Sequence, residues 1–221
     1  MPLNGITIAP RVDAHAAGIE ALRGVPSSVI GDVMGRLTGT TALRPVHRTP
    51  IAICGNAVTV RVRAGDNLLI HRALDMLQPG DVLLVDGEGD VSRALVGEIM
   101  MTSARVRGAL GFVIDGAVRD VDAFEEHRFA CWARGVSLRG PYKDGPGSIN
   151  QPITVGGMLV TPGDVIAADS DGVVAIAPAE ALAVARRAHE KVAQERQTID
   201  SIVAGTYSSA WVEATLKQKG A

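Results

Sequence analysis

Hydrophobic positions recur with a helical period at both ends of the chain. Near the N-terminus this pattern predicts a helix over about residues 13–22, followed by a second helix with Ser27 or Ser28 as its N-cap. The expected hydrophobic face of the second helix consists of Val29, Val33 and Leu37. Near the C-terminus a long amphipathic helix is predicted over about residues 178–203, and its charged residues indicate a solvated face.

The middle of the chain alternates strand-like hydrophobic runs with helical patterns. Val58, Val60 and Val62 alternate with polar residues, which predicts a half-buried strand. Further strands are predicted at 82–85, 111–115 and 129–133, with helices over 68–77, over 97–107 and from 121. After residue 150 short strands follow one another, at Ile153, 158–160, 165–168 and 173–176. This order favours an α/β core with a second β layer, a three-layer β/β/α sandwich, over a fully parallel doubly wound sheet.

The length and composition are those of one globular domain. The 221 residues are 47% hydrophobic and 21% charged, and no linker-like segment interrupts them. We expect a single domain over residues 1–221, with a core over about 25–178 and a C-terminal helix and tail over about 178–221 that can reach a partner subunit. Residues 79–86 and 162–169 resemble each other, and two copies indicate similar turn–strand units rather than a repeat architecture.

Charge and composition exclude several classes of function. A net charge of −2 and 3% aromatic residues argue against a nucleic-acid-binding protein, which needs a basic surface or stacking side chains. No apolar stretch approaches the roughly 20 residues that span a bilayer, and the N-terminus has no secretory pattern. Cys54 and Cys131 lie far apart, which disfavours a disulfide framework or a structural zinc site and fits a reducing cytoplasm.

The first candidate site follows the strand predicted at residues 111–115. Ligands in open α/β sheets bind beyond the carboxyl ends of strands, and Arg119 and Asp120 come just after this one, with Gly116 as the expected turn. An arginine offers a planar fork for a carboxylate, and an aspartate offers a hard oxygen ligand for Mg²⁺ or Mn²⁺. The alternative is structural, with Asp120 as a helix cap and Arg119 on the surface.

The second candidate site is the predicted helix start at Gly97 and Glu98, followed by Ile99 and Met100. Free N–H groups at a helix N-terminus attract an anion such as a carboxylate. Glu98 is a candidate acid–base or outer metal-shell carboxylate, and the alternative is a favourable charge in the first helical turn.

Other types of site lack support. The five histidines show no metal-ligand spacing, no nucleophile elbow is present, and neither a P-loop nor a dinucleotide-binding glycine motif occurs. A Schiff-base mechanism is disfavoured because the proposed site segments contain no lysine, the nearest in sequence being Lys143.

Together these segments resemble the RraA-like family, which includes the 4-hydroxy-4-methyl-2-oxoglutarate / 4-carboxy-4-hydroxy-2-oxoadipate aldolases. The resemblance covers about residues 25–205. Its most specific part is an acidic residue, twenty residues, then Arg-Asp, which here is Glu98 followed by Arg119-Asp120. The family has Asp at the first position, so Glu98 departs from the pattern by one methylene.

The resemblance implies a β/β/α sandwich of the swivelling-domain type, assembled as trimers or hexamers with sites between subunits. It implies that Asp120 holds Mg²⁺ or Mn²⁺, with Glu98 in the outer shell, and that Arg119 contacts the 2-oxo acid. The N–H groups of 97–100 are expected to bind the pyruvate carboxylate. A glutamate from a neighbouring subunit's C-terminal helix also takes part in the family, and Glu195 matches it best, with Glu190 as the alternative.

The implied activity is a metal-dependent pyruvate aldolase that also decarboxylates oxaloacetate. Two alternatives stay open. One is a non-enzymatic RraA-type regulator that binds a ribonuclease, because the fold is shared. The other is a metal-dependent lyase for a different 2-oxo acid, which the Glu98 departure favours.

Overall fold

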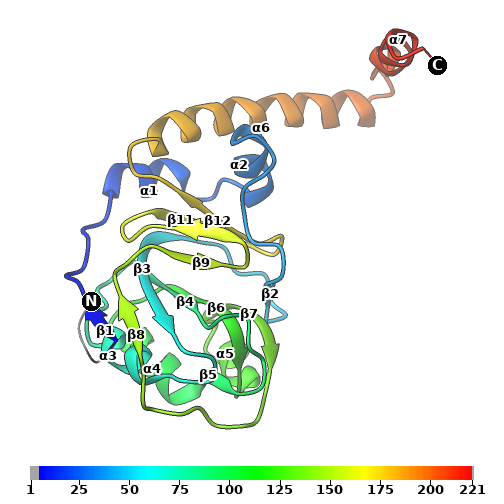
Figure 1. Ribbon diagram of the computed structural model, residues 1–221. Coiled ribbons are helices and arrows are strands. Elements are labelled where there is room, and N and C mark those ends of the chain that lie inside the picture. Colours follow the sequence, from blue (N-terminus) through cyan, green and yellow to red (C-terminus); the bar gives the residue numbers. More distant parts are fainter. Residues whose placement is uncertain (1–4, 221) are drawn as a thin grey trace.

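The computed structural model describes residues 5–220, and a large mixed sheet forms its centre (Figure 1). The strand order is β1-β8-β3-β4-β6-β7-β2, with β5 paired to β6 and β11 paired to both β3 and β12. The central strands β3, β4, β6 and β7 are parallel. The strands of this sheet are β1 (Ile6–Ile8), β2 (Arg44–Pro45), β3 (Ile53–Val62), β4 (Asp81–Asp86), β5 (Ala94–Val96), β6 (Gly111–Val118), β7 (Ala130–Val136), β8 (Gly147–Ile149), β11 (Val165–Ala168) and β12 (Val173–Ile176).

Three helices cover one face of the parallel strands: α3 (Leu68–Leu74), α4 (Glu98–Val106) and α5 (Val121–Glu126). They connect successive parallel strands, as βαβ crossovers require. Buried side chains from these helices and from the sheet form one hydrophobic cluster, in which Phe112, Phe124 and Phe129 meet edge to face or tilted.

The opposite face is covered by a second β layer. The hairpin β9 (Ile153–Val155) and β10 (Met158–Val160) packs there together with β11 and β12. Trp132 is fully buried in this second cluster, and its indole N–H donates to the carbonyl of Asp169 at 2.9 Å. The expected three-layer β/β/α sandwich is confirmed.

A further group of helices lies outside the β11–β12 pair. The helices α1 (Ala16–Leu22) and α2 (Ser27–Val33) pack with the first turns of α6 (Ala181–Val203) over a third hydrophobic cluster (Figure 1). The rest of α6 extends away from the body and leads to α7 (Ala210–Gln218). No helix within residues 5–220 is long and apolar enough to cross a membrane.

Several local expectations are wrong. The second helix ends at Val33 because Gly35 and Arg36 adopt positive φ, which leaves Leu37 96% exposed. Neither Ser27 nor Ser28 caps this helix. The residue before the helix is Pro26, and Ser27 instead binds the carboxylate of Asp169 through both its amide and its hydroxyl.

Two strands also differ from expectation. Thr59 is fully buried because both faces of β3 are covered, and its hydroxyl donates to the carbonyl of Gln151 at 2.7 Å. Gly116 is not a turn, because β6 continues to Val118 through an irregularity between Ile114 and Ala117. A Cβ at Gly116 would lie 2.8 Å from Leu95, so close packing explains the glycine.

Candidate active site

A pocket of about 270 Å³ lies where β5 and β6 end and α4 begins. This is the edge at which the parallel strands present their carboxyl ends, where open α/β sheets bind ligands. Both candidate segments contribute to it. The lining residues are Asn67, His71, Ala94, Leu95, Val96, Gly97, Ile99, Met100, Arg119, Asp120, Pro141 and Lys143.

Asp120 stands at the junction of β6 and α5 in a left-handed conformation, with φ of 56°. A non-glycine residue rarely adopts this conformation, and such residues concentrate at functional sites. Its side chain forms no cap on α5. Instead, Oδ2 accepts the backbone N–H of Glu98 at 3.1 Å and lies 3.6 Å from Nε of Arg119. The structure therefore brings the two candidate segments into direct contact.

Gly97 is required by this contact. A Cβ at this position would overlap Oδ2 of Asp120 and lie 3.0 Å from Cγ of Arg119. The backbone N–H of Arg119 also donates to the carbonyl of Val96 at 3.0 Å, which ties the ends of β5 and β6 together. Only a residue without a side chain lets Arg119 and Asp120 approach the start of α4 this closely.

The start of α4 has the properties of an anion site. Ile99 and Met100 line the pocket, and their backbone N–H groups have no hydrogen-bond partner among residues 5–220. Arg119 lines the same pocket, and its side chain is partly exposed. Two free N–H groups beside a guanidinium can bind a carboxylate.

The chemistry of Asp120 fits Mg²⁺ or Mn²⁺ that keeps most of its water. Oδ1 of Asp120 has no partner within the described chain, and its side chain is 43% exposed. No cluster of three or more His, Cys, Asp or Glu side chains within residues 5–220 could enclose a metal ion. Mg²⁺ is commonly bound by one or two carboxylates together with water and substrate, so a single free carboxylate oxygen in a pocket suits it.

Three polar lining residues were missed by the sequence analysis: Asn67, His71 and Lys143. Nζ of Lys143 lies 3.5 Å from Oδ1 of Asn67, whose amide donates to the carbonyl of Leu95 at 2.9 Å. Partial burial, and then the charge of Lys143, lower the pKa of His71. The site segments themselves contain no lysine, as the sequence analysis states, but the fold brings Lys143 into the pocket lining from a separate loop. The sequence feature that points to Lys143 is its place in the Gly- and Pro-rich loop over 139–150, because such loops often carry functional residues.

Comparison with known proteins identifies the family. The RraA-like family, described as Aldolase/RraA, matches residues 27–175. The chain belongs to the RraA-like family. A relative from Halalkalibacterium halodurans named "Putative 4-hydroxy-4-methyl-2-oxoglutarate aldolase" is 36% identical over 191 residues, which cover 84% of this chain and 90% of that protein.

Solved structures of similar fold include an uncharacterized protein and an RNA-processing inhibitor. An uncharacterized protein from Pseudomonas syringae superimposes with a TM-score of 0.78 at 22% identity, covering 90% of this chain and 96% of that one. The RNA-processing inhibitor RraA from Thermus thermophilis superimposes with a TM-score of 0.62 at 27% identity, covering 68% of this chain and 92% of that one. Family membership therefore does not by itself distinguish an enzyme from an inhibitor.

The remaining expected site residues lie outside the pocket lining. The side chain of Glu98 is exposed, and only its backbone contacts Asp120. Glu195 and Glu190 lie on α6, after the end of the family match at residue 175 and on the opposite side of the sheet from α4 (Figure 1). Glu195 forms an ion pair of 3.0 Å with Lys191 of the same helix. The structure does not bring Glu195 to the pocket of its own chain.

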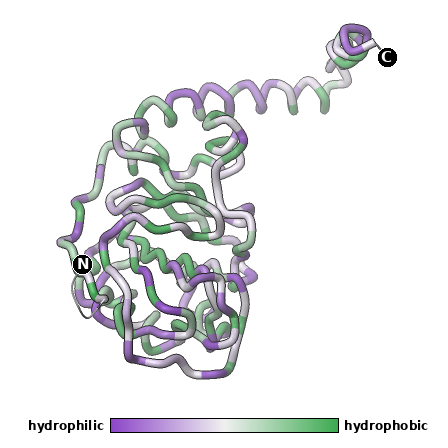
Figure 2. Tube along the Cα trace, in the orientation of Figure 1, coloured by the Kyte–Doolittle hydropathy of each residue, from purple (hydrophilic) through white to green (hydrophobic). Residues whose placement is uncertain are grey.

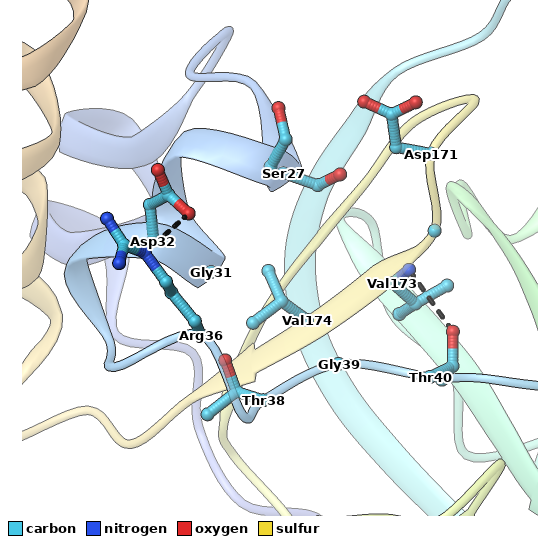
Figure 3. Close-up of a pocket in the computed structure, with 12 residues that line it drawn as sticks. Ser27, Gly31, Asp32, Arg36, Thr38, Gly39, Thr40, Asp171, Val173 and Val174 are labelled. Carbon is cyan, nitrogen blue, oxygen red and sulfur yellow. Dashed lines mark hydrogen bonds and ion pairs between the residues drawn. The ribbon is translucent and has the colours of Figure 1, made fainter. Parts of the chain in front are cut away.

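A second pocket of about 240 Å³ lies between α2 and β12 (Figure 3). Hydroxyl groups and the carboxylates of Asp32 and Asp171 line it, and Asp32 is already paired with two cations. Asp32 lies 3.4 Å from Arg36 and 3.2 Å from Lys191, and the hydroxyl of Thr40 accepts the N–H of Val173 at 3.3 Å. This pocket has no free arginine and no helix start of sufficient length, so it does not compete with the pocket at Asp120.

Proposed function

We propose that this protein is a divalent-metal-dependent pyruvate aldolase that cleaves 4-hydroxy-4-methyl-2-oxoglutarate or 4-carboxy-4-hydroxy-2-oxoadipate and also decarboxylates oxaloacetate. The observation that carries the proposal is the contact between Asp120, Arg119 and the start of α4 inside one pocket. The identity to a relative with an aldolase name, over most of both chains, supports it.

The pocket provides a binding mode for the 2-oxo acid. The free N–H groups of Ile99 and Met100 bind the carboxylate next to the keto group. Arg119 donates to the keto oxygen and stabilises the negative charge that develops on it. Lys143 adds a second cation for the distal carboxylate of a diacid.

Asp120 would hold the Mg²⁺ or Mn²⁺ ion, which when bound supplies Lewis-acid polarisation of the keto group. A carboxylate, from Glu98 or from Glu195 of a partner subunit, accepts the proton of the C4 hydroxyl through a water molecule. The C3–C4 bond breaks, its electron pair forms the enolate of pyruvate, and the C4 hydroxyl becomes a keto group. The enolate then takes a proton at C3 and leaves as pyruvate.

The pattern of α6 supports a site completed by a second copy of the chain. Buried Val184, Ala185 and Ala188 attach α6 to its own body, and no residue after Ala188 on this helix is buried. The same stripe continues at alternating intervals of four and three residues as Val192, Glu195, Ile199 and Ile202. Figure 2 shows hydrophobic positions recurring between hydrophilic ones along this extended helix.

An exposed stripe of this kind is stable only when another surface covers it. Ile199 and Ile202 are 53% and 54% exposed in the single chain. A partner that covers them also contacts Glu195, which lies between Val192 and Ile199. This placement supports a homotrimer or hexamer in which Glu195 enters the pocket of a neighbour.

The test is pyruvate release measured with a coupled lactate dehydrogenase assay. Both the 4-hydroxy diacid and oxaloacetate are supplied, with Mg²⁺ or with EDTA. Arg119→Ala is expected to lower the rate about 10²- to 10³-fold relative to wild type, which is the usual effect of removing one hydrogen-bond donor to a developing oxyanion. Arg105→Ala, which changes an exposed arginine outside the pocket, is the control and keeps the rate. Absence of pyruvate from either substrate with the oligomer intact would refute the proposal.

Mixing two inactive variants tests the contribution of the partner. Subunits of Arg119→Ala and Glu195→Gln, unfolded and refolded together, would regain up to about a quarter of wild-type activity in a cyclic trimer. No gain on mixing would place Glu195 outside the neighbour's site.

The RraA-type regulator is the second candidate function, because the chain superimposes on 92% of the inhibitor RraA at 27% identity. A lyase for another 2-oxo acid is the third, and Glu98 in place of aspartate favours it. If pyruvate is absent, binding to a purified ribonuclease distinguishes the regulator from a lyase with a different substrate.

A further inference from the structure

Asp66 is a fully buried carboxylate that connects two walls of the candidate active site. Its Oδ2 accepts the backbone N–H groups of Asp144 at 2.7 Å and of Gly145 at 3.0 Å. Its Oδ1 accepts the N–H of Leu68 at 3.0 Å, at the start of α3. Both oxygens therefore accept backbone N–H groups, and two of these three backbone bonds reach a segment almost eighty residues later in the chain. A fourth bond, at 3.3 Å, comes from the guanidinium of Arg63.

The segment that Asp66 binds carries Lys143. On one side of this lysine, Tyr142 exchanges backbone hydrogen bonds with the residues that flank Asp66. Its N–H donates to Gly65 at 2.8 Å, and its carbonyl accepts from Asn67 at 3.0 Å. On the other side, Asp144 is held by the Asp66 carboxylate itself. The backbone of Lys143 is thus fixed at both neighbours.

The side chain of Lys143 has no comparably strong anchor. Its closest polar contact is Oδ1 of Asn67 at 3.5 Å, which is too long for a strong hydrogen bond, and the residue is exposed. The position of its ammonium group in the pocket therefore depends on the backbone that supports it.

The charge state of Asp66 strengthens its hydrogen bonds to the backbone around Lys143. Burial on its own would raise the pKa of Asp66, but hydrogen bonds from Asp144, Leu68 and Gly145 and the charge of Arg63 hold it below the ordinary value. The group is therefore a charged acceptor, and backbone N–H groups bind charged acceptors more strongly than neutral ones.

We propose that Asp66 is a positioning residue, which holds the backbone of 142–145 so that Lys143 faces the substrate pocket beside Asn67. The proposal rests on the proposed function for the role of Lys143. Its structural part, the hold on the loop, is independent of any activity.

The first experiment measures amide hydrogen exchange at single-residue resolution. In the wild-type protein the amides of Asp144 and Gly145 are expected to exchange more slowly than the amide of Gly140, whose N–H has no hydrogen-bond acceptor within residues 5–220. In Asp66→Asn these two amides speed up, because an amide oxygen replaces a charged acceptor. Asp164→Asn is the matched control, since Asp164 is also a buried turn aspartate but binds the amide of Thr161 away from the pocket. If the amides of Asp144 and Gly145 in the wild-type protein exchange as fast as the amide of Gly140, the proposal is overturned. This result does not depend on whether the variant folds.

The second experiment is a double-mutant cycle on pyruvate release. Asp66→Asn is expected to lower kcat/KM about 10- to 100-fold, as for a misplaced group, while Asp164→Asn leaves it unchanged. Combined with Lys143→Met, Asp66→Asn is expected to cost little more than Lys143→Met alone, because both changes remove the same interaction. Full additivity of the two losses overturns the proposal. A wild-type protein without activity would remove the proposed function, and the exchange data would still decide whether Asp66 holds the loop.

Discussion

Gly97→Ala offers a sharp test of the candidate active site, because the structure predicts damage to the site without damage to the fold. The φ of Gly97 is −155°, which is extended backbone that alanine also adopts. The added Cβ would overlap only Oδ2 of Asp120 and the side chain of Arg119 within 3.2 Å. The Asp120 carboxylate is the end of a side chain and Arg119 is a long flexible one, and both are partly exposed, so they can move without disturbing the core.

The expected loss follows from the size of that movement. To reach ordinary van der Waals contact, the Asp120 carboxylate must shift by about 1 Å, and a shift of this size costs up to about 10²-fold in rate. The hydrogen bond from the N–H of Glu98 to Asp120 is lost at the same time. We expect kcat/KM for pyruvate release to fall by about 10- to 100-fold and the midpoint concentration of Mg²⁺ to rise. Unfolding free energy should change by less than about 1 kcal/mol, the range of substitutions that leave the core intact.

Gly140→Ala is the matched control. A Cβ at Gly140 also faces Arg119, but at 3.7 Å from Nη1, an ordinary contact. The variant is expected to keep wild-type activity. Activity of Gly97→Ala within twofold of wild type would refute the placement of Asp120 and Arg119 at the reacting centre, and so would a loss explained entirely by unfolding.

Four further outcomes are expected. Arg11→Met should destabilise the protein in urea by about 2–4 kcal/mol, because it leaves the fully buried Asp81 carboxylate without the arginine that binds it at 2.6 and 2.8 Å. Burial and then the charge of Lys143 lower the pKa of His71 in the folded protein. Below pH 6.5 the unfolded chain therefore binds more protons at this residue than the folded protein does. Relative to His71→Gln, wild type should therefore lose stability as the pH falls below 6.5 and through the lowered pKa, measured by urea unfolding at pH 5 and 7.5. Borohydride with pyruvate should leave no adduct on Lys143 by mass spectrometry if Lys143 binds a carboxylate and forms no Schiff base. Burial raises the pKa of Cys54 to about 11, so a thiol reagent at pH 8 should label it only after unfolding.

The parts of the fold that the sequence predicts are those with strong local signals. The strands at 158–160, 165–168 and 173–176 match β10, β11 and β12, because each is a short hydrophobic run between turn residues. The two similar segments at 79–86 and 162–169 have the structural role expected of them. Asp81 and Asp164 each accept the N–H of the residue three positions earlier, both at 2.8 Å, which closes the turn before a strand.

The errors arise where distant segments decide the environment of a residue. The alternation at 58–62 is typical of a half-buried strand, and only the tertiary structure, with layers on both faces, buries Thr59. The helical period extends to Leu37, but Gly35 ends the helix, because a glycine just after a hydrophobic run is a C-cap signal that overrides the period.

Part of the candidate site could likewise be predicted from local sequence, and part depends on contacts between distant segments. Arg119 and Asp120 could be placed from sequence because the carboxyl-end rule applies to the strand that precedes them. Their contact with the start of α4 required β5 to pair with β6, a three-residue strand that local pattern does not reveal. Lys143 and Asn67 lie 76 positions apart and meet only through the loop that Asp66 holds, so no local signal joins them.

The charge balance of the pocket explains why this arrangement suits a dicarboxylic substrate. Arg119 and Lys143 contribute two positive charges, Asp120 contributes one negative charge, and the lowered pKa keeps His71 neutral at pH 7. The lining therefore carries one net positive charge, and a divalent ion on Asp120 would raise it to about three. A diacid with a ketone compensates most of that charge, whereas a neutral sugar or an amine leaves it uncompensated in a confined space. Besides Asp120, which already binds the N–H of Glu98 and would hold the metal ion, the lining has no carboxylate to accept the proton of the C4 hydroxyl. The exposed carboxylates of Glu98 and of Glu195 on a neighbouring α6 are the groups that can accept this proton. If Glu195 accepts it, oligomer assembly and activity should be lost together.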